Sequence, residues 1–248
     1  NSQGTKITCV VGNCPEVEAA NSTSVVEFEN SLLTDVTGYV AIDTTNSAIV
    51  VAFRGTSSVR GVIADAMFGA TETDICDGCT AATGFYNSWR EARDGVMAAV
   101  KSASAQYPKY EIVTTGHSLG GAIADFAAAE LRNQGYNVAL YTYGSPRIGS
   151  STISEYISNQ PGGNYRVTHY NDVVPRLPPS FLNYAHISPE YYISSKNNKP
   201  VTANDIMVYS GIDEDDGNGK FLLTDVNAHM WYFNDISECN QKGLELFK

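Results

Sequence analysis

Residues 116–120 read Gly-His-Ser-Leu-Gly, a G-x-S-x-G pattern that places Ser118 between two stretches of different periodicity. Residues 110–115, before it, are rich in β-branched and aromatic types and predict a buried strand. After it, apolar residues recur at steps of three and four through Leu131, which predicts a helix. A serine at such a corner exposes its hydroxyl at a helix N-terminus, where unpaired N–H groups favour developing negative charge. Although G-x-S-x-G also occurs in ordinary turns, this context favours a nucleophile.

A serine hydroxyl is a poor nucleophile until a base takes its proton, so a histidine and an orienting carboxylate must accompany Ser118. Three histidines follow it in the sequence. His169 lies within an expected strand, and His186 lies in a loop rich in Pro and Tyr. His229 precedes an apolar run that could anchor it over the serine. We therefore predict that His229 is the base and that His169 is structural.

The carboxylate should follow a central strand, because catalytic groups lie at the carboxyl ends of the strands in open α/β sheets. Asp172 comes two residues beyond the expected strand 165–170. Asp205 and Asp225 are weaker candidates, since neither clearly follows a central strand. The prediction is therefore Asp172, which gives the chain order Ser, Asp, His.

The apolar stretch 49–53 predicts a central strand and ends in Arg54-Gly55-Thr56. In this architecture the loop after such a strand supplies one backbone N–H to a developing oxyanion, and the residue after the nucleophile supplies the other. These roles fall to Thr56 and Leu119. Thr56 could also be an ordinary turn or N-cap threonine.

Residues 57–69 form a short amphipathic segment directly after that loop. Its apolar stripe at helical spacing consists of Val59, Val62, Ile63, Ala66 and Met67. Such a stripe is also typical of core packing. Its position beside the oxyanion loop favours instead a lid that covers the serine in water and turns its apolar face to a lipid surface.

The whole pattern predicts one α/β domain over residues 1–248, with a mostly parallel central sheet, an antiparallel N-terminal part and helices on both faces. Strands are expected over 25–29, 38–43, 47–53, 138–143 and 165–170. Helices are expected over 84–106 and 151–159. Residues 175–200, rich in Pro, Tyr and Asn, are expected to be surface loops with little regular structure.

The composition excludes several classes of function. Sixteen basic and 27 acidic residues give a net charge of −11, which disfavours binding to nucleic acids and anionic membranes. No apolar run is long enough to span a bilayer. We find no signal peptide pattern and expect a mature or trimmed chain. A glycosylation sequon at Asn21 agrees with a secreted protein.

The five cysteines also bear on the compartment. Cys9 and Cys14 flank a short loop, and Cys76 and Cys79 form a second close pair, so each pair could bridge locally. Zinc binding or a redox site at the second pair would need supporting residues that the sequence lacks. Disulfides imply an oxidising compartment. Cys239 is left over, which indicates a partner outside this sequence.

Five motifs together resemble the filamentous-fungal class 3 lipases of the Rhizomucor and Thermomyces type. They are GHSLGG at 116–121, FRGT at 53–56, YGSPR at 143–147, THYNDVVPRLP at 168–178 and AHMWYF at 228–233. The resemblance covers nearly the whole chain. It implies an α/β-hydrolase fold, the same triad, oxyanion residues and lid as predicted above, and bridges within both cysteine pairs. It implies no metal or organic cofactor.

Two features depart from the family pattern. Family members carry an N-terminal helix with a cysteine that would pair with Cys239, whereas this chain begins after it. We therefore expect proteolytic processing, with the cut segment either still disulfide-linked or lost. The lid often has a tryptophan where this chain has Val62, which loosens any inference about the preferred lipid.

The resemblance implies a secreted carboxylic ester hydrolase that cleaves acylglycerols at a lipid–water interface through an acyl-enzyme. Rivals within the family are mono- and diacylglycerol lipases, phospholipases A1 and feruloyl esterases. Residues 220–225 and the lid look more like the partial-glyceride lipases, and the apolar lid argues against a feruloyl esterase. A non-catalytic lipid-binding protein on the same fold is the alternative of a different class. Such proteins usually lose a triad member, and none is missing here.

Overall fold

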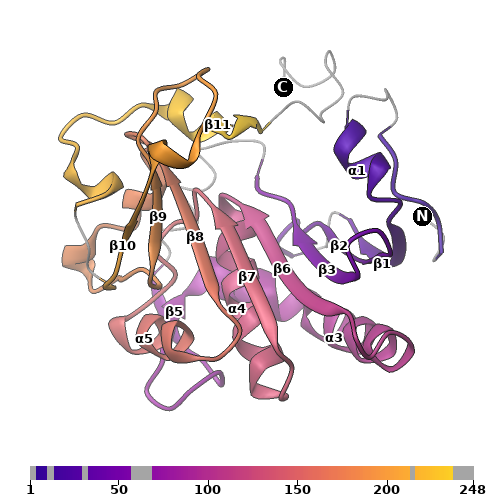
Figure 1. Cartoon of the computed structure of the whole chain (residues 1–248). Coiled ribbons are helices and arrows are strands. Elements are labelled where there is room, and N and C mark those ends of the chain that lie inside the picture. The colour runs from indigo at the N-terminus through magenta and orange to yellow at the C-terminus, as the bar shows by residue number, and fades with distance from the viewer. Residues whose placement is uncertain (1–3, 10–13, 30–32, 57–68, 213–215, 237–248) are drawn as a thin grey trace.

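The structure is a computed structural model, and it describes residues 4–9, 14–29, 33–56, 69–212 and 216–236 (Figure 1). Its main sheet has the order β1-β2-β3-β6-β7-β8-β9-β10. These strands are β1 Thr23–Phe28, β2 Gly38–Asp43, β3 Ala48–Phe53, β6 Glu111–His117, β7 Val138–Tyr143, β8 Asn164–His169, β9 Glu190–Ile193 and β10 Ile206–Tyr209. The first three pair antiparallel, β3 through β9 pair parallel, and β10 is antiparallel to β9. This is the mostly parallel sheet with an antiparallel N-terminal part that the sequence predicts.

The other elements are helices and short ladders. The helices are α1 Pro15–Ala19, α3 Thr83–Gln106, α4 Leu119–Asn133 and α5 Ser151–Asn159. Two small ladders join β4 Ala70–Glu72 to β5 Thr80–Ala82 and β11 Trp231–Tyr232 to β12 Asn234–Asp235. The 3-10 turns are η1 Val174–Arg176, η2 Ser180–Leu182, η3 Ala203–Asp205, η4 Asn218–Lys220 and η5 Val226–Met230. No helix within the described ranges is long and apolar enough to cross a membrane.

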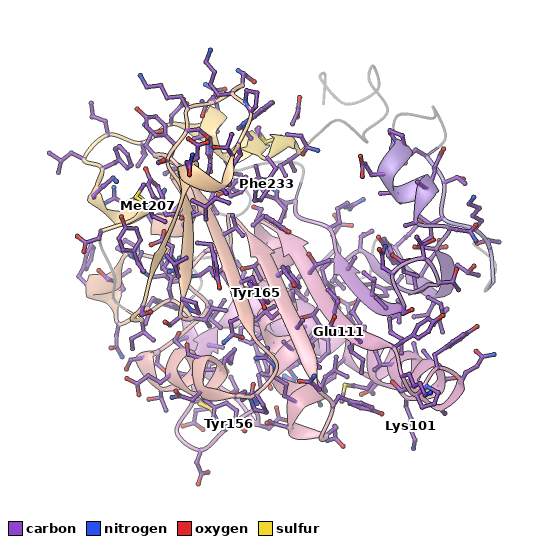
Figure 2. All side chains as sticks on the ribbon, viewed as in Figure 1. Lys101, Glu111, Tyr156, Tyr165, Met207 and Phe233 are labelled. Carbon is purple, nitrogen blue, oxygen red and sulfur yellow. A yellow bond between two sulfur atoms is a disulfide. The ribbon has the colours of Figure 1, made fainter. Side chains whose placement is uncertain are left out.

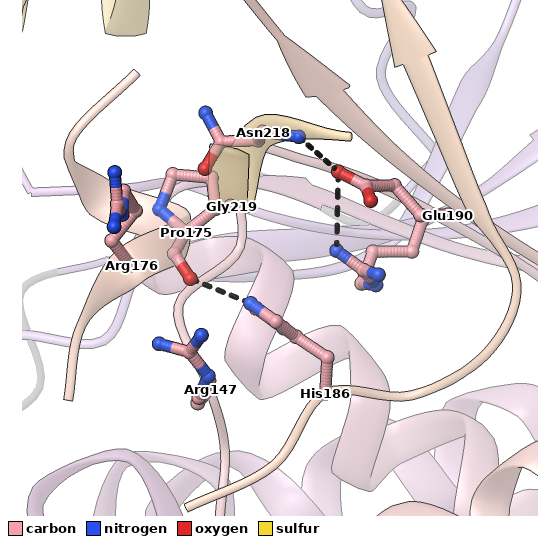
Figure 3. Close-up of a pocket in the computed structure, with 8 residues that line it drawn as sticks. Arg147, Pro175, Arg176, His186, Glu190, Asn218 and Gly219 are labelled. Atoms are coloured by element: carbon pink, nitrogen blue, oxygen red, sulfur yellow. Dashed lines mark hydrogen bonds and ion pairs between the residues drawn. The ribbon is translucent and has the colours of Figure 1, made fainter. Parts of the chain in front are cut away.

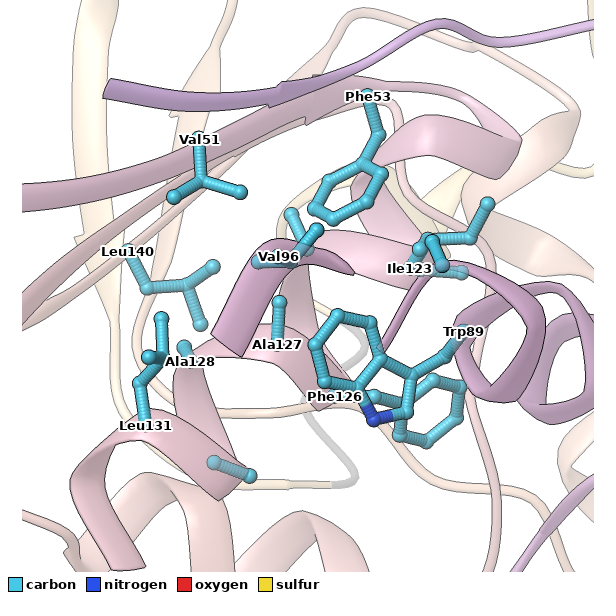
Figure 4. Packing of buried hydrophobic residues seen from close by; sticks show 14 of the residues in the cluster. Val51, Phe53, Trp89, Val96, Ile123, Phe126, Ala127, Ala128, Leu131 and Leu140 are labelled. Atoms are coloured by element: carbon cyan, nitrogen blue, oxygen red, sulfur yellow. The ribbon is translucent and has the colours of Figure 1, made fainter. Parts of the chain in front are cut away.

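The main core lies between the sheet and the helices α3 and α4 (Figure 4). Most of α4 is buried, because small residues such as Ala127 and Ala128 let it lie close to the strands. Trp89 of α3 packs edge-on against Phe53 of β3, with ring centroids 6.2 Å apart. The indole N–H of Trp89 donates to Glu130 of α4 at 2.8 Å, so the buried polar atom keeps a partner. This packing fixes α4, and with it the corner at Ser118.

The described helices α3, α4 and α5 lie along the sheet of this α/β fold. Figure 1 shows the sheet in front, with α3, α4 and α5 behind it. Burial alternates along β6, where Ile112 and Thr114 are buried and Val113 and Thr115 are only half-buried. Such alternation is typical of a strand with one covered face.

The expectation of surface loops over residues 175–200 is wrong at β9, and β10 follows shortly after it. β9 has the sequence Glu-Tyr-Tyr-Ile, which shows no clear alternation or apolar run. It forms a strand by pairing with β8 and β10, and its glutamate is buried against a cation. Glu190 lies 3.9 Å from the guanidinium of Arg166 on β8 and accepts a hydrogen bond from the hydroxyl of Thr168. A buried charge needs such partners, and sequence alone did not reveal them.

A second buried carboxyl predicts how stability depends on pH. Asp125 in α4 is buried, and the Ser145 hydroxyl donates to its Oδ2 at 3.4 Å. Burial raises the pKa of Asp125 to about 8 from its usual 3.8. The folded state therefore keeps a proton that the unfolded chain loses, so the free energy of unfolding falls as the pH rises from about 4 to about 8.

We expect Asp125→Asn to remove this loss. Urea unfolding at several pH values should show the wild type losing up to about 1.4 kcal/mol per pH unit relative to the variant between pH 4 and 8. Asp94→Asn, on the exposed side of α3, is the control and should follow the wild type. A difference between Asp125→Asn and wild type that is constant with pH would show that Asp125 is ionised in the folded protein.

Candidate active site

The corner at Ser118 has the geometry that the sequence predicts. β6 ends at His117, α4 begins at Leu119, and Ser118 between them has φ 58° and ψ −129°. A positive φ is strained for a residue with a side chain, and such strain persists only where the surroundings enforce it. Here the Ser118 N–H donates to the Tyr143 carbonyl at 2.9 Å, and the Ser118 carbonyl accepts from Gly121 at 2.9 Å. The backbone is thus held on both sides of the hydroxyl.

Two glycines make this corner possible. A Cβ added at Gly116 would lie 2.2 Å from the carbonyl of Gly120. A Cβ added at Gly120 would lie 2.2 Å from the carbonyl oxygen of Phe53 on β3. Both distances are far below van der Waals contact with backbone that cannot move aside. The strand, the helix and the neighbouring strand therefore meet at this point only because these positions carry no side chain.

The structure joins two of the predicted residues directly. Nδ1 of His229, on η5, lies 2.8 Å from Oδ2 of Asp172, which follows β8. The His229 side chain is 2% exposed and that of Asp172 is fully buried. The other carboxylate oxygen, Oδ1, accepts from the Val174 N–H at 2.8 Å. A carboxylate fixed in this way orients the imidazole and selects the tautomer whose Nε2 can accept a proton.

Tyr232 is a site residue that the sequence analysis did not identify. Its hydroxyl donates to Oδ2 of Asp172 at 2.5 Å, the same oxygen that faces His229. Burial, together with the charge of Asp172, raises the pKa of Tyr232 well above its usual value. The hydroxyl therefore keeps its proton and remains a donor. The apolar run at 230–233 predicts that this segment is anchored near the site, but it does not predict the hydrogen bond of the Tyr232 hydroxyl.

We expect Tyr232→Phe to lower kcat for ester hydrolysis about 10-fold, with little change in KM. A hydrogen bond to a charged group contributes about 1.5–3 kcal/mol, and this one holds the carboxylate that orients His229. Tyr209→Phe is the control, because its hydroxyl contacts only Met207 on β10 in the described structure. Steady-state kinetics on a soluble ester would measure both variants. An unchanged kcat in Tyr232→Phe would mean that Val174 alone suffices to hold Asp172.

Ser118 contacts Tyr143 and His229 contacts the adjacent Gly144, so these two neighbours link Ser118 to His229. The Tyr143 carbonyl binds the backbone of Ser118, as described above. A Cβ added at Gly144 would lie 3.0 Å from the His229 ring, so the imidazole packs directly on this glycine. Ser118 Oγ and His229 Nε2 are both buried, and neither has a hydrogen-bond partner within the described part of the chain. These are the two atoms between which a proton would pass.

His117 connects the corner to the segment that carries His229. Its Nε2–H donates to the His229 carbonyl at 2.8 Å, and the two rings lie 4.3 Å apart. Burial, and then the nearby charge of His229, lower the pKa of His117 to about 3. His117 therefore stays neutral around pH 7 and acts as a donor that positions its neighbour.

The predicted oxyanion residues lie beside the corner at Ser118. Leu119 is the first residue of α4, so its N–H has no partner within the helix. Thr56 follows β3, and the preceding Gly55 is so close to the corner that an added Cβ would lie 3.2 Å from Cβ of Ser118. The predicted lid residues Val59, Val62, Ile63, Ala66 and Met67 lie outside the described residues, which resume at 69.

The rejected candidates have structural contacts of their own. His169 is fully buried, with its ring nitrogens 2.9 Å from the carbonyls of Ala228 and Ser195. Asp205 and Asp225 accept hydrogen bonds from the backbone at the start of η3 and η5. Both therefore stabilise short turns.

A small polar pocket lies behind the turn that follows Asp172 (Figure 3). Its lining includes the ion pair of Arg166 and Glu190. Glu190 also accepts from the Asn218 N–H at 3.1 Å, and the His186 ring donates to the Pro175 carbonyl at 2.5 Å. Burial and the nearby arginine charges lower the pKa of His186 well below its usual value. His186 is thus a neutral support for the chain beyond Asp172.

The cysteine pairs form the bridges expected of them. Cys9–Cys14 and Cys76–Cys79 are disulfides, with Cα atoms 5.9 and 5.4 Å apart. Asn21 of the sequon is exposed in the turn between α1 and β1. Cys239 lies outside the described residues.

Comparisons with known proteins find similarity over most of the chain. The family profile for lipase (class 3) matches residues 50–182. Secreted mono- and diacylglycerol lipase A of Penicillium cyclopium is 49% identical over 245 residues, which are 97% of this chain and 80% of that protein. The crystal structure of mono- and diacylglycerol lipase from Aspergillus oryzae has a TM-score of 0.91 at 44% identity, over 96% of this chain and 90% of that one. The Rhizomucor miehei triacylglyceride lipase has a TM-score of 0.83 at 30% identity, over 91% and 86%.

Proposed function

This chain belongs to the class 3 lipase family, and from that premise we propose that it hydrolyses the ester bonds of mono- and diacylglycerols through Ser118, Asp172 and His229. The family and the α/β-hydrolase fold make it a carboxylic ester hydrolase. The observation that carries the assignment of the site is the contact of His229 Nδ1 with the buried Asp172, which leaves Nε2 directed elsewhere.

In the proposed mechanism, His229 Nε2 takes the proton of Ser118 as Oγ attacks the ester carbonyl. The backbone N–H groups of Thr56 and Leu119 hold the oxyanion that forms. His229 then gives the proton to the leaving glycerol oxygen as the ester bond breaks. Water, deprotonated by His229, attacks the acyl-serine and releases the fatty acid. Asp172 orients the imidazole in each step.

The partial glycerides are favoured because the P. cyclopium and A. oryzae relatives, both named mono- and diacylglycerol lipases, are 49% and 44% identical. The triacylglyceride lipase of R. miehei is 30% identical. A side-by-side assay of tri-, di- and monoglyceride, phosphatidylcholine and a feruloyl ester tests this choice. We expect turnover of mono- and diglyceride to exceed that of the other three. If the triglyceride, the phospholipid or the feruloyl ester were hydrolysed faster than the mono- and diglyceride, the proposed substrate class would be wrong.

A non-catalytic lipid-binding protein is the competing proposal of another class. Titration of the protein with an activated alkyl phosphonate separates the two, because only an activated serine forms the covalent adduct. We expect one adduct per chain, and peptide mapping should locate it at Ser118. A protein that takes up no phosphonate would not be a serine hydrolase.

We also propose that the protein is secreted and that Cys239 pairs with a cysteine outside this sequence. Relatives are named secreted lipases, and the two disulfides suit an oxidising compartment. Of the five cysteines, four are used in those bridges, which leaves Cys239. Intact mass of the natural protein before and after reduction tests the pairing. A mass change no larger than that of the two local bridges would exclude a linked segment.

A further inference from the structure

Exposed apolar side chains are concentrated near the segment that carries His229. Ten large apolar residues are exposed within the described ranges, and half of them fall between 222 and 233: Leu222, Leu223, Val226, Met230 and Phe233. Leu222 is 99% exposed and the adjacent Leu223 is 83% exposed. Single exposed leucines are ordinary, whereas neighbouring ones mark contact surfaces. We call Leu222 and Leu223 the leucine pair.

The residue before the leucine pair is fixed to the body of the protein. The Phe221 ring packs against the Tyr170 ring at 5.0 Å, and the Phe221 carbonyl accepts from Arg176. The preceding Lys220 places its ammonium 4.5 Å from the centre of the Tyr192 ring. The chain is therefore anchored immediately before it turns outward.

The chain is equally fixed at and after the pair. The Asn171 side chain donates to the Leu223 carbonyl at 3.2 Å, and the Asp225 N–H donates to the Asn171 carbonyl at 3.0 Å. The Asp225 carboxylate accepts from Asn197 at 3.1 Å. The two leucines are thus displayed by a well-connected segment, and turning them inward would break contacts on both sides.

This segment stands at the same end of the sheet as the active site. Asn171, which binds Leu223, directly precedes Asp172, and Asp225 forms a parallel bridge with Asp172. His229 follows on the same segment. Figure 1 shows that the segment crosses the molecule at the arrowhead end of β8, the strand that Asp172 follows. A surface that brings an ester to Ser118 would therefore also meet the leucine pair.

We propose that Leu222 and Leu223 form a fixed anchor that inserts into the surface of an uncharged or zwitterionic lipid layer and holds the active-site end of the enzyme against it. The proposal rests on the proposed function, since it concerns the delivery of lipid to that same site. The anchor includes no residue of the predicted lid at 57–69. Anionic lipid is disfavoured because the chain carries a net charge of −11. Lys220 and Asp225, which flank the pair, offset each other.

Binding to vesicles tests the anchor without turnover. All proteins carry Ser118→Ala, and the probe is a phosphatidylcholine vesicle assayed by co-sedimentation. Adding Leu222→Ala and Leu223→Ala together should weaken the partition coefficient by about 10-fold or more, given the apolar area that two leucines bury in lipid. Val208→Ala is the control, because Val208 is also exposed but lies on β10 opposite Tyr191, near the amino end of β9 and away from the active-site end of the sheet. An unchanged coefficient in the double variant, or an equal loss in the control, would overturn the proposal.

Activity on two physical forms of substrate gives a second readout. With Ser118 intact, the double variant should hydrolyse a dissolved butyrate ester at the wild-type rate and lose about 10-fold on emulsified diolein. An equal loss on both substrates would place the leucines in catalysis rather than in surface binding. Gel filtration tests whether the leucine pair instead binds a second copy of this chain. A wild-type dimer that becomes a monomer in the double variant, with vesicle binding unchanged, would assign the pair to self-association. If the wild type cleaves neither ester, the proposed function fails, while the vesicle assay still decides the anchor.

Discussion

Replacing Ser118 with alanine should lower kcat for ester hydrolysis by about 100,000-fold or more, with the protein still folded. The nucleophile of a serine hydrolase acts as a unit with its base, so removing it alone costs nearly as much as removing the whole triad. The variant should also take up no phosphonate. Ester turnover in purified Ser118→Ala is the measurement, with far-UV circular dichroism to confirm the fold.

Ser88→Ala provides the matched control. Ser88 is also a buried serine, but its hydroxyl donates to the Gly84 carbonyl within α3 and lies outside the proposed site. It should keep wild-type kcat and wild-type labelling. Substantial hydrolysis by Ser118→Ala, with a phosphonate adduct on another residue, would mean that the corner between β6 and α4 does not supply the nucleophile.

Asp172→Asn should lower kcat by about 10,000-fold while leaving the overall geometry intact. An amide of the same shape can donate to His229 Nδ1, which favours the tautomer whose Nε2 carries the proton and cannot accept one from Ser118. The amide also gives no charge to stabilise the imidazolium that forms during the reaction. Phosphonate labelling of this variant should be slowed in parallel with ester turnover.

Asp225→Asn is the control for the loss of a carboxylate next to the site. Asp225 pairs with Asp172 through the backbone and accepts hydrogen bonds from Asn227 and Asn197, but within the described residues it forms no hydrogen bond with His229. Its substitution should change kcat less than about threefold, in keeping with one exposed hydrogen bond. Similar losses in both variants would point to a shared structural defect and not to a specific role of Asp172.

The local part of the site could be predicted from the sequence because it depends on neighbours along the chain. The corner at Ser118 follows from a strand, a glycine turn and a helix that are contiguous in sequence. Asp172 follows from the rule that catalytic groups lie beyond strand ends, and its contact with His229 agrees with that choice. The bounds of β2, β7 and α5 coincide with the expected ranges.

Other features depend on side-chain directions that a sequence does not contain. In the sequence, Tyr232 is one of the four residues of the apolar run 230–233. Only the folded chain directs its hydroxyl to Asp172. β9 was missed because Glu190 is stabilised by Arg166 on a separate strand. Strands such as β6 alternate buried and half-buried positions, and the half-buried side chains lie on the more open side of the sheet. Figure 2 shows Glu111 and Tyr165 on that open side of the sheet.

The exposure of the leucine pair could not be predicted from the sequence either. Residues 220–225 resemble the partial-glyceride lipases, but the sequence alone does not indicate that Leu222 and Leu223 are exposed. Their exposure follows from the contacts of Phe221 and Asn171 on either side, which are long-range. Hydrophobic residues are assigned to the core by default, and here tertiary contacts reverse that default.

The three proposed catalytic groups come from distant parts of the chain, and the base comes last. The corner that holds Ser118 exists once β6 and α4 have formed. Asp172 reaches its position only when β8 pairs with β7, and His229 only when η5 folds back across the strand ends. A nascent polypeptide that already displays its serine therefore has nothing to deprotonate it. By the proposed mechanism, ester hydrolysis therefore begins only after the segment carrying His229 has been synthesised and has docked.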